Sequence, residues 1–443
     1  MSVLDLLKPA PNREKIQDEA KVKKEYKYWR LRTFYGMYIG YAFYYFTRKS
    51  FTFAMPAMIR DLGFDKAQLG MLGSILAISY GVSKFLSGII SDRSNPRYFM
   101  GIGLILTGIF NIFFGLSSVF WLFALFWGLN GWFQGWGWPP CAKLLTHWYS
   151  QSERGRWWSI WSTSHNLGGA IIPIVCAFLA QSFGWRYALY VPGLSCIFIG
   201  FFIINRLRDT PESLGLPNVE KFHNEPVKVV DENRLALSSK EILVDYVLKN
   251  KFIWVLAISY FFVYVIRQAV NDWLFLYLIE KKGYSMTVAS STVFWFEVGG
   301  FFGILSAGWF SDKIFRGRRG PVNALFSLCV IVAIILFWKN PGINILLDSF
   351  LMGMMGFFVF GPQMLIGIAA AELSHKKAAG TATGFAGTFA YLGAAMAGGP
   401  LGWVTERYGW EGFFVVLTFC GVMAFLILLP LWTVSSNPKM VES

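Results

Sequence analysis

Long apolar segments constrain this sequence more than any other feature. Twelve stretches of about 20 residues or more carry few charges, and about 20 mostly apolar residues form a helix that spans a membrane. Of the 443 residues 55% are apolar and only 15% are charged, whereas soluble domains average about 25% charged residues. The stretches lack the alternation typical of membrane barrels. The sequence therefore predicts an all-α integral membrane protein with twelve transmembrane helices.

The apolar segments also predict how the chain is organised. We expect helices over 32–57, 66–91, 97–116, 119–147, 156–182, 185–205, 252–280, 285–311, 321–338, 342–370, 378–404 and 411–433. They give five parts: a basic N-terminal segment 1–31, a six-helix bundle 32–205, a linker 206–251, a second six-helix bundle 252–433 and a tail 434–443.

The net charge of +14 comes mainly from basic residues in alternate connections between the helices. By the positive-inside rule, these connections and both termini lie in the cytoplasm. Membrane topology therefore accounts for the positive charge, and nucleic-acid binding is not needed to explain it. The sequence also contains no nucleic-acid-binding motif. The five cysteines lie in apolar runs without CxxC or disulfide spacing. No metal-ligand spacing, nucleotide-binding loop or hydrolase motif occurs, so we expect no metal, no cofactor and no enzymatic activity.

The two halves of the chain repeat. The sequence GIISDR runs from Gly88 to Asp92 and Arg93, and GWFSDK runs from Gly308 to Asp312 and Lys313, 220 residues later. Arg48 and Arg267 lie 219 residues apart in the first and seventh helices. Near-constant offsets predict two parallel six-helix repeats, the arrangement of a secondary transporter. Two such loops at matching helix ends resemble the signature loops of the major facilitator superfamily, where they would act in conformational change.

Ionisable residues inside membrane helices are costly, so each one is a functional candidate. Helical spacing places Arg48 on one face with tyrosines of the first helix, and Arg267 on one face with Tyr264 and Asn271. Lys84 follows Tyr80 by one turn in the second helix, and His165 adjoins Asn166 in the fifth. The tyrosines of the first helix are Tyr41, Tyr44 and Tyr45.

This set of bases and hydroxyls suits a dianionic phosphate ligand. A guanidinium presents a planar fork to phosphate oxygens, whereas a lysine is a point charge. Structural alternatives stay open at this stage: Lys84 snorkels to a surface, the tyrosines and His165 are packing residues, or the arginines pair with internal acids. The candidate acids are Glu297 and Asp272.

Five motifs resemble the organophosphate:phosphate antiporter family, most closely its bacterial hexose-6-phosphate transporters and their sensor homologue. They are FYYFTRKSF (43–51), YGVSK (80–84), SHNLGG (164–169), YVIR (264–267) and FGPQMLIG (360–367). The resemblance implies that Arg48 and Arg267 bind phosphate, surrounded by Lys84, His165, Tyr41, Tyr45, Tyr80 and Tyr264. It also implies exchange of external sugar phosphate for internal phosphate by alternating access.

One departure from the family pattern concerns substrate choice. The hexose-phosphate transporter branch carries an Asp and a Lys three residues apart in its eleventh helix, where this chain has Thr383 and Ala386, followed by the candidate cavity residue Tyr391. We therefore keep two hypotheses. The first is a monomeric exchanger of glucose 6-phosphate for phosphate in the bacterial inner membrane. The second is a membrane sensor of sugar phosphate that regulates a histidine kinase and transports little.

Overall fold

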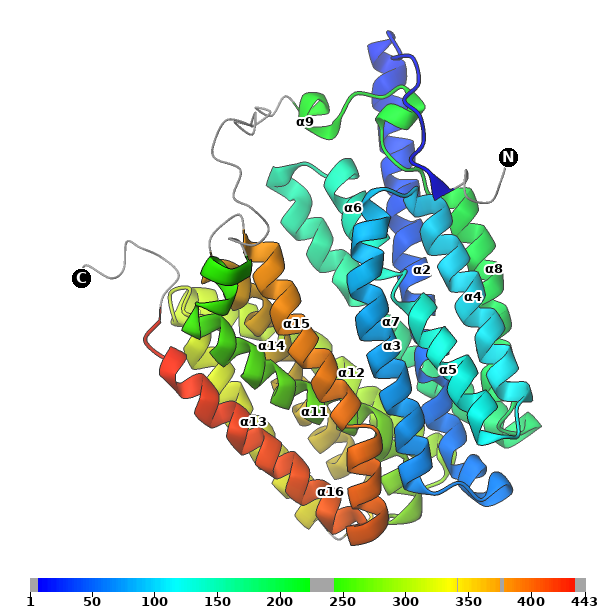
Figure 1. Ribbon diagram of the computed structural model, residues 1–443, viewed down its shortest axis with the longest axis vertical. Coiled ribbons are helices and arrows are strands. Elements are labelled where there is room, and N and C mark those ends of the chain that lie inside the picture. The colour runs from blue at the N-terminus through cyan, green and yellow to red at the C-terminus, as the bar shows by residue number, and fades with distance from the viewer. Residues whose placement is uncertain (1–6, 224–242, 341, 375–377, 435–443) are drawn as a thin grey trace. The chain divides into compact units, whose positions relative to one another are not determined.

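The computed structural model describes residues 7–223, 243–340, 342–374 and 378–434, in which the regular elements are all helices and no β-strand occurs (Figure 1). The chain divides into two compact units. Unit 1 comprises Met1–Phe51, Ser79–Ile172 and Phe183–Glu232; unit 2 comprises Thr52–Ile78, Pro173–Ser182 and Asn233–Ser443. Three helices pass from one unit into the other: α2 (Glu19–Leu62), α3 (Lys66–Asp92) and α7 (Gln151–Phe183).

Unit 1 is held together by close helix packing through glycines. Its other elements are α4 (Pro96–Leu116), α5 (Phe120–Gln134), α6 (Trp138–Trp148), α8 (Tyr187–Arg206), η1 (Glu212–Leu214) and α9 (Val219–Phe222). Helices α4 and α8 lie side by side (Figure 1). A Cβ on Gly193 would lie 2.8 Å from the carbonyl oxygen of Gly108, so the two backbones touch there. Small residues allow such approach in membrane helices, where lipid provides no hydrophobic drive for association.

Unit 2 uses the same kind of packing. Its remaining elements are η2 (Val244–Leu248), α11 (Lys251–Glu280), α12 (Met286–Trp309), η3 (Phe310–Ile314), α13 (Arg319–Lys339), α14 (Ile345–Glu372), α15 (Ala379–Met396), α16 (Gly399–Leu428) and η5 (Leu429–Leu431). Helix α12 packs on α14, α11 on α15, and α13 on both α14 and α16. A Cβ on Gly299 would lie 2.9 Å from the Cα of Gly353, so glycines also set the α12–α14 distance.

Each of the twelve predicted helices has a helical counterpart, and the fourth differs most. The range 119–147 is divided into α5 and α6 by a turn over 135–137. Pro139 and Pro140 follow Trp138 in the first turn of α6, where backbone N–H groups have no acceptor within the helix, so their absence costs little. A Cβ on Gly135 would lie 2.8 Å from the amide nitrogen of Lys84, so the turn also lets α3 approach closely.

The eleventh and twelfth helices are joined differently from the prediction. The break within 378–404 lies at Ala397 and Gly398, between α15 and α16. Helix α16 then continues through the predicted connection, where Gly409 is its one non-helical residue, with φ 67° and ψ −168°. A positive φ is readily adopted by glycine alone. A single glycine therefore replaces the expected loop of six residues.

The first helix begins at Glu19, 13 residues before the predicted start of the transmembrane segment. Tyr26 explains the extension, because it is fully buried and its ring stacks on Phe222 at 3.9 Å between centroids. It also meets Trp148 edge-on. The end of the predicted N-terminal segment is therefore packed against the first half of the predicted linker. Residues 1–6, 224–242 and 435–443, which belong to the predicted N-terminal segment, linker and tail, lie outside the described residues.

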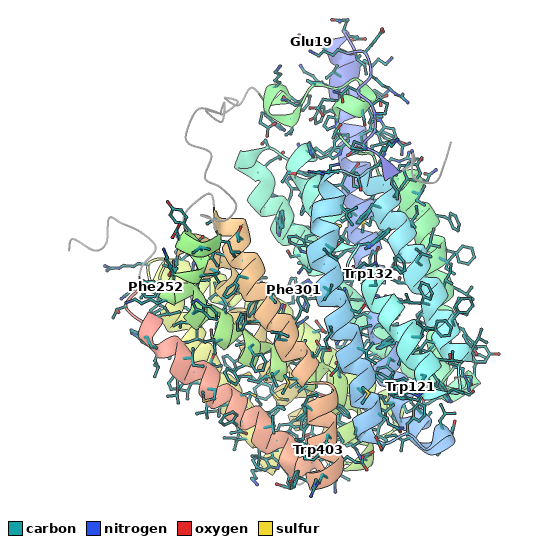
Figure 2. All side chains as sticks on the ribbon, in the orientation of Figure 1. Glu19, Trp121, Trp132, Phe252, Phe301 and Trp403 are labelled. Carbon is teal, nitrogen blue, oxygen red and sulfur yellow. The ribbon has the colours of Figure 1, made fainter. Side chains whose placement is uncertain are left out.

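Nine helical stretches within the described residues are long and apolar enough to cross a membrane. The charged α2 and the divided α5–α6 are not among them, and Thr381–Leu431 counts once although it holds the eleventh and twelfth helices. The protein is therefore a multi-pass membrane protein. Trp121 and Trp403 are 73% and 49% exposed, and Figure 2 shows each at the periphery of its own unit. Such tryptophans are typical of helices that face lipid near the interface.

Candidate functional site

Arg48 forms the centre of the candidate site in unit 1. Its Nε and Nη2 both donate to the Oε1 of Gln134, at 3.2 and 3.1 Å. The amide nitrogen of Gln134 donates to the Tyr44 carbonyl oxygen at 3.1 Å and to the Thr47 hydroxyl at 2.9 Å. It also donates to the Oδ1 of Asn130 at 3.2 Å. Gln134 is 1% exposed, so this network holds the guanidinium in one direction.

Aromatic rings flank the Arg48 guanidinium on two sides. Its Cζ lies 4.5 Å from the ring centroid of Tyr45 and 4.5 Å from that of Tyr80. Tyr45 lies 5.8 Å from the His165 ring, and Tyr41 lies 6.0 Å from Tyr45. The structure thus brings five of the predicted site residues into one cluster from α2, α3 and α7. Desolvated cation–π contacts stabilise a buried guanidinium without neutralising it.

The other two predicted residues of unit 1 are Lys84 and Asn166. The ammonium of Lys84 is 5.1 Å from the ring centroid of Trp138, and this lysine is half-buried rather than fully buried. Asn166 is 5% exposed and adjoins His165 in α7. Lys84 therefore has an aromatic neighbour on α6, which the sequence pattern did not indicate.

Arg267 holds the corresponding place in unit 2 and is 8% exposed. Its Cζ lies 5.5 Å from the ring centroid of Tyr264 and 5.0 Å from that of Phe360. Tyr391 lies 5.9 Å from Tyr264, and Tyr260 lies 4.9 Å from it on the same helix. The predicted residues Arg267, Tyr264 and Tyr391 are therefore neighbours. Arg48 packs on Gln134 of α5, whereas Arg267 packs on Phe360 of α14, the helix that corresponds to α5 in the repeat.

The two candidate acids lie on different helices, Asp272 on α11 with Arg267 and Glu297 on α12, and they have different surroundings. Glu297 is 2% exposed and accepts a hydrogen bond from the Nδ2 of Asn271 at 3.3 Å. Asp272 accepts from the Nε2 of Gln268 at 2.5 Å and is half-buried. Each acid thus has an amide partner on α11. The two positions at which the chain departs from the hexose-phosphate transporter pattern also have different environments: Ala386 is fully buried and Thr383 is exposed.

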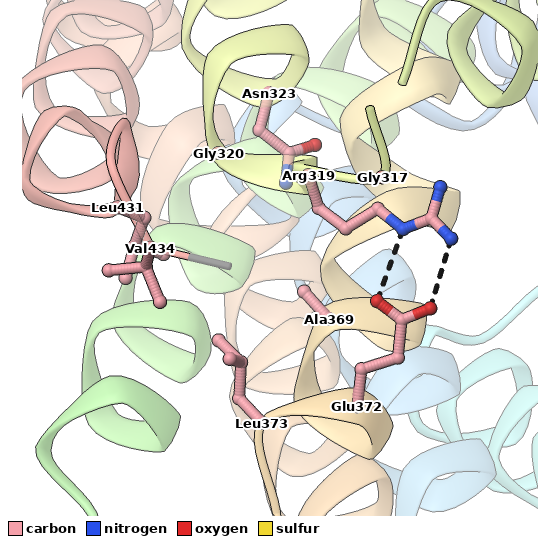
Figure 3. Close-up of a pocket in the computed structure, with 9 residues that line it drawn as sticks. All are labelled: Gly317, Arg319, Gly320, Asn323, Ala369, Glu372, Leu373, Leu431 and Val434. Atoms are coloured by element: carbon pink, nitrogen blue, oxygen red, sulfur yellow. Dashed lines mark hydrogen bonds and ion pairs between the residues drawn. The ribbon is translucent and has the colours of Figure 1, made fainter. Parts of the chain in front are cut away.

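The repeated loops end their helices as predicted, with different detail in the two halves. Asp312 accepts from the Nη1 of Arg319 at 2.5 Å, while Arg319 forms a two-pronged pair with Glu372 at 3.1 and 3.0 Å (Figure 3). Gly308 and Lys313 flank Asp312 on α12 and η3. In the first half Arg93 is exposed and Gly88 has no neighbour within 4 Å of an added Cβ. The side chain of Asp92 lies outside the described residues.

A small surface pocket lies beside the Arg319–Glu372 pair (Figure 3). It is bounded by the start of α13, the end of α14 and the end of η5, and Asn323 contributes a fully buried amide. The pocket contains none of the residues predicted to bind phosphate. We therefore treat it as separate from the candidate site.

Sequence reasoning missed two buried polar groups. The first is Gln134, an uncharged residue in an aromatic run that gives no charge signal. The second is the Lys282–Asp348 pair, at 2.6 Å with both side chains at most 4% exposed. Tyr284 donates to the other Asp348 oxygen at 2.6 Å. Asp348 lies in the apolar helix α14 and Lys282 follows α11, so the rule that buried charge is costly could have identified both residues from the sequence.

Comparison with known proteins agrees with this architecture. A model of the Major Facilitator Superfamily matches residues 37–398. The "Probable hexose phosphate transport protein" of Chlamydia pneumoniae is 59% identical over 97% of each chain. The "Membrane sensor protein UhpC" of Escherichia coli (strain K12) is 48% identical over 97% of this chain and 98% of its own. The "Glycerol-3-phosphate transporter" of Bacillus subtilis (strain 168) is 42% identical over 99% and 100%.

The fold is also found among solved structures. The crystal structure of a bacterial homologue of the human lysosomal transporter Spinster, in an inward-facing and unoccupied conformation, superposes with a TM-score of 0.71. It covers 91% of this chain and 96% of its own, at 16% sequence identity. At that identity the likeness shows the fold alone. The relatives are transport and sensor proteins, and the chain is a transport-family protein rather than an enzyme.

Proposed function

Because the chain belongs to the Major Facilitator Superfamily, within its organophosphate:phosphate antiporter group, we propose that it exchanges a hexose phosphate for inorganic phosphate. Glucose 6-phosphate is the first candidate substrate. The observation that carries this proposal is the 58–59% identity, over almost the whole chain, to relatives named for hexose phosphate transport. We place the protein in the cytoplasmic membrane of a bacterium, with both termini in the cytoplasm, as a monomer.

In the proposed mechanism, Arg48 and Arg267 bind the phosphate group from the two repeats. Each guanidinium offers donors in a planar fork, which matches phosphate oxygens better than an ammonium does. Lys84 and His165 add positive charge or donors, while Tyr41, Tyr45, Tyr80, Tyr264 and Tyr391 supply hydroxyls and ring faces. Asn166 is a further donor. The repeat relation and the aromatic packing common to both arginines support this assignment.

The two arginines contact only the phosphate group, so other side chains select the sugar. A phosphate clamp recognises the part that substrate and counter-substrate share, so inorganic phosphate and a sugar phosphate compete for it. Alternating access with one shared site then gives exchange rather than net uptake. The repeated loops around Asp92 and Asp312 would act during reorientation.

The test is uptake of labelled glucose 6-phosphate into proteoliposomes. Vesicles loaded with inorganic phosphate should accumulate the label, and vesicles loaded with sulfate should accumulate much less. Unlabelled inorganic phosphate outside should compete, whereas glucose, which lacks the phosphate group, should not. Equal uptake into both kinds of vesicle would contradict obligatory exchange.

The second candidate function is a sugar-phosphate sensor that regulates a histidine kinase. The 48% identity to a membrane sensor protein favours it, as does the absence of the Asp–Lys pair at Thr383 and Ala386. Identity to the hexose phosphate transport proteins is higher, which places transport first. A protein that binds glucose 6-phosphate in a thermal-shift assay but gives no uptake in phosphate-loaded vesicles would be assigned to the sensor.

A further inference from the structure

Four arginines of unit 1 gather where α8 ends, and none is among the residues of the proposed transport site. We call them the arginine cluster: Arg32 on α2, Arg97 on α4, Arg206 at the end of α8 and Arg208 just beyond it. Arg32 donates to the carbonyl oxygen and Oδ1 of Asn205 at 3.2 and 2.7 Å. Arg208 donates to the same carbonyl oxygen at 3.0 Å. The cluster therefore joins α2 and α4 to the C-terminal end of α8.

The four arginines make further contacts with a carbonyl oxygen and with aromatic rings. Arg97 donates through Nε to the carbonyl oxygen of Ile204. The guanidinium carbons of Arg32 and Arg208 lie 5.0 and 4.4 Å from the ring centroid of Trp29. Arg206 lies 5.2 Å from the ring centroid of Phe202. Two arginines thus share one carbonyl and one indole, which places like charges side by side.

The positive charge of the cluster is not neutralised within the part of the chain that the structure describes. Among the described residues no carboxylate forms an ion pair with any of the four arginines. The carbonyl groups at the end of one helix carry only about half a negative charge. Partial burial and the neighbouring charges of Arg97 and Arg32 lower the pKa of Arg208 to about 10. The carbonyl groups at the end of α8 therefore compensate only part of the positive charge of the four arginines.

Two donors in the cluster are also left over. The Nε atoms of Arg32 and Arg206 are buried and have no hydrogen-bond partner. A buried donor without an acceptor is costly, and most such groups in folded proteins have a partner. An oxyanion held among the guanidinium groups would supply both the missing charge and further acceptors. The natural candidate is a phosphate group.

Exposed apolar side chains flank the cluster on both α8 and α2. Phe198 and Phe201, one to two turns before the end of α8, are 72% and 60% exposed. Leu31 and Tyr28, beside Arg32 on α2, are 59% and 51% exposed. A free phosphate ion needs only the charged groups, whereas a phospholipid also covers an exposed apolar helix face. Basic pockets between membrane helices, at the level of the interface, are typical of anionic lipid headgroup sites.

We propose that the arginine cluster binds the phosphodiester headgroup of an anionic phospholipid, whose acyl chains lie along the exposed phenylalanines of α8. The site is separate from the proposed transport site and does not depend on the transported substrate. It predicts a lipid that stays with the protein through purification and that ties α2, α4 and α8 together at this end of unit 1.

The test uses the full-length protein in nanodiscs of phosphatidylcholine with a minor fraction of cardiolipin, followed by native mass spectrometry. The variant is Arg97→Gln with Arg206→Gln, and the matched control is Lys23→Gln with Lys24→Gln, which removes the same charge from exposed positions of α2. Two juxtamembrane arginines contribute a factor of about thirty to anionic lipid binding. We expect the variant to lose retained cardiolipin by roughly that factor, while the control stays within about twofold of wild type.

A second arm separates the two sources of phosphate. Inorganic phosphate at millimolar concentration should not displace the retained cardiolipin; full displacement would assign the cluster to soluble phosphate and overturn the lipid proposal. Equal cardiolipin retention by the arginine variant, the lysine control and wild type would also overturn it. If the double variant fails to purify as a folded protein, Arg206→Gln alone serves, because the Nε of Arg206 has no hydrogen-bond partner to lose. It should still lose retention about fivefold.

Discussion

The Oε1 of Gln134 accepts two hydrogen bonds from the Arg48 guanidinium, while the amide nitrogen of the same side chain is bound by three acceptors. This arrangement fixes the orientation of the amide, since the nitrogen faces only acceptors. It therefore presents an oxygen to Arg48 and cannot flip without losing several bonds. Gln134 acts on the ligand through Arg48, as a positioning residue of the proposed site.

The first prediction concerns this glutamine. Gln134→Ala should raise the KM for phosphate about tenfold or more, because a hydrogen bond to a charged group contributes about 1.5–3 kcal/mol. Gln134→Glu should weaken phosphate binding further, since a carboxylate pairs with Arg48 and competes with the ligand. Exchange kinetics in proteoliposomes measure both effects. Gln181→Ala, an exposed glutamine of α7, is the matched control, and an unchanged KM in Gln134→Ala would contradict a positioning role.

The second prediction concerns the two repeat-related arginines. Arg48→Lys and Arg267→Lys should each reduce phosphate exchange by at least about a hundredfold, because lysine keeps the charge but loses the fork. Arg60→Lys, at an arginine 76% exposed, should leave exchange unchanged. The readout is phosphate self-exchange in variants with wild-type size-exclusion profiles. Near wild-type exchange by both folded lysine variants would eliminate the clamp and favour pairing of the arginines with internal acids.

The third prediction concerns topology. Single cysteines placed at Lys221 and Lys281, both exposed, in a background without the five native cysteines should react differently with an impermeant maleimide. Position 281 should react in intact cells, and position 221 should react only after the membrane is permeabilised, as the positive-inside rule requires. The opposite pattern would invert the proposed orientation of both termini.

The fourth prediction concerns the buried Lys282–Asp348 pair. Asp348→Asn leaves a lysine ammonium buried without its counter-charge, so the free energy of unfolding should fall by about 3–5 kcal/mol. Lys282→Met together with Asp348→Leu should be less destabilising than Asp348→Asn, because no charge is then left alone. Thermal unfolding in detergent compares them. The exposed Lys339–Glu411 pair, at 4.0 Å, is the control, and Lys339→Met should change stability by at most about 1 kcal/mol. A wild-type melting temperature for Asp348→Asn would refute the prediction.

The fold was largely predictable, because the long apolar segments and the repeat of the Asp92 and Asp312 loops can be recognised in the sequence without knowledge of tertiary contacts. Element boundaries were harder where tertiary contacts decide them. The extension of α2 depends on Tyr26 stacking on Phe222, and residues nearly 200 positions apart give no local signal of that contact. Gly409 is similar, since one positive φ separates two helices where composition indicates a loop.

The candidate site was predictable where charge marked it. Arg48 and Tyr45 are neighbours as helical spacing suggested, and Tyr80 and His165 lie beside them as the family resemblance implied. Gln134 was not found, because a neutral amide in an aromatic helix is unremarkable until its partners are known. The roles of Arg48 and Arg267 in binding remain predictions, because geometry within each unit describes the side chains and not the ligand.

The three helices that belong to both compact units have a mechanical consequence. The boundary in α2 follows Arg48 by three residues, and the boundary in α3 precedes Tyr80 by one. In α7 it falls at Pro173, which lacks the N–H that would stiffen the helix. An α-helix resists bending, so any displacement of one unit against the other must bend α2, α3 and α7. The proposed anion, bound at Arg48 and Tyr80, would change the bending stiffness at those points, so its binding free energy and the elastic cost of reorientation would be coupled.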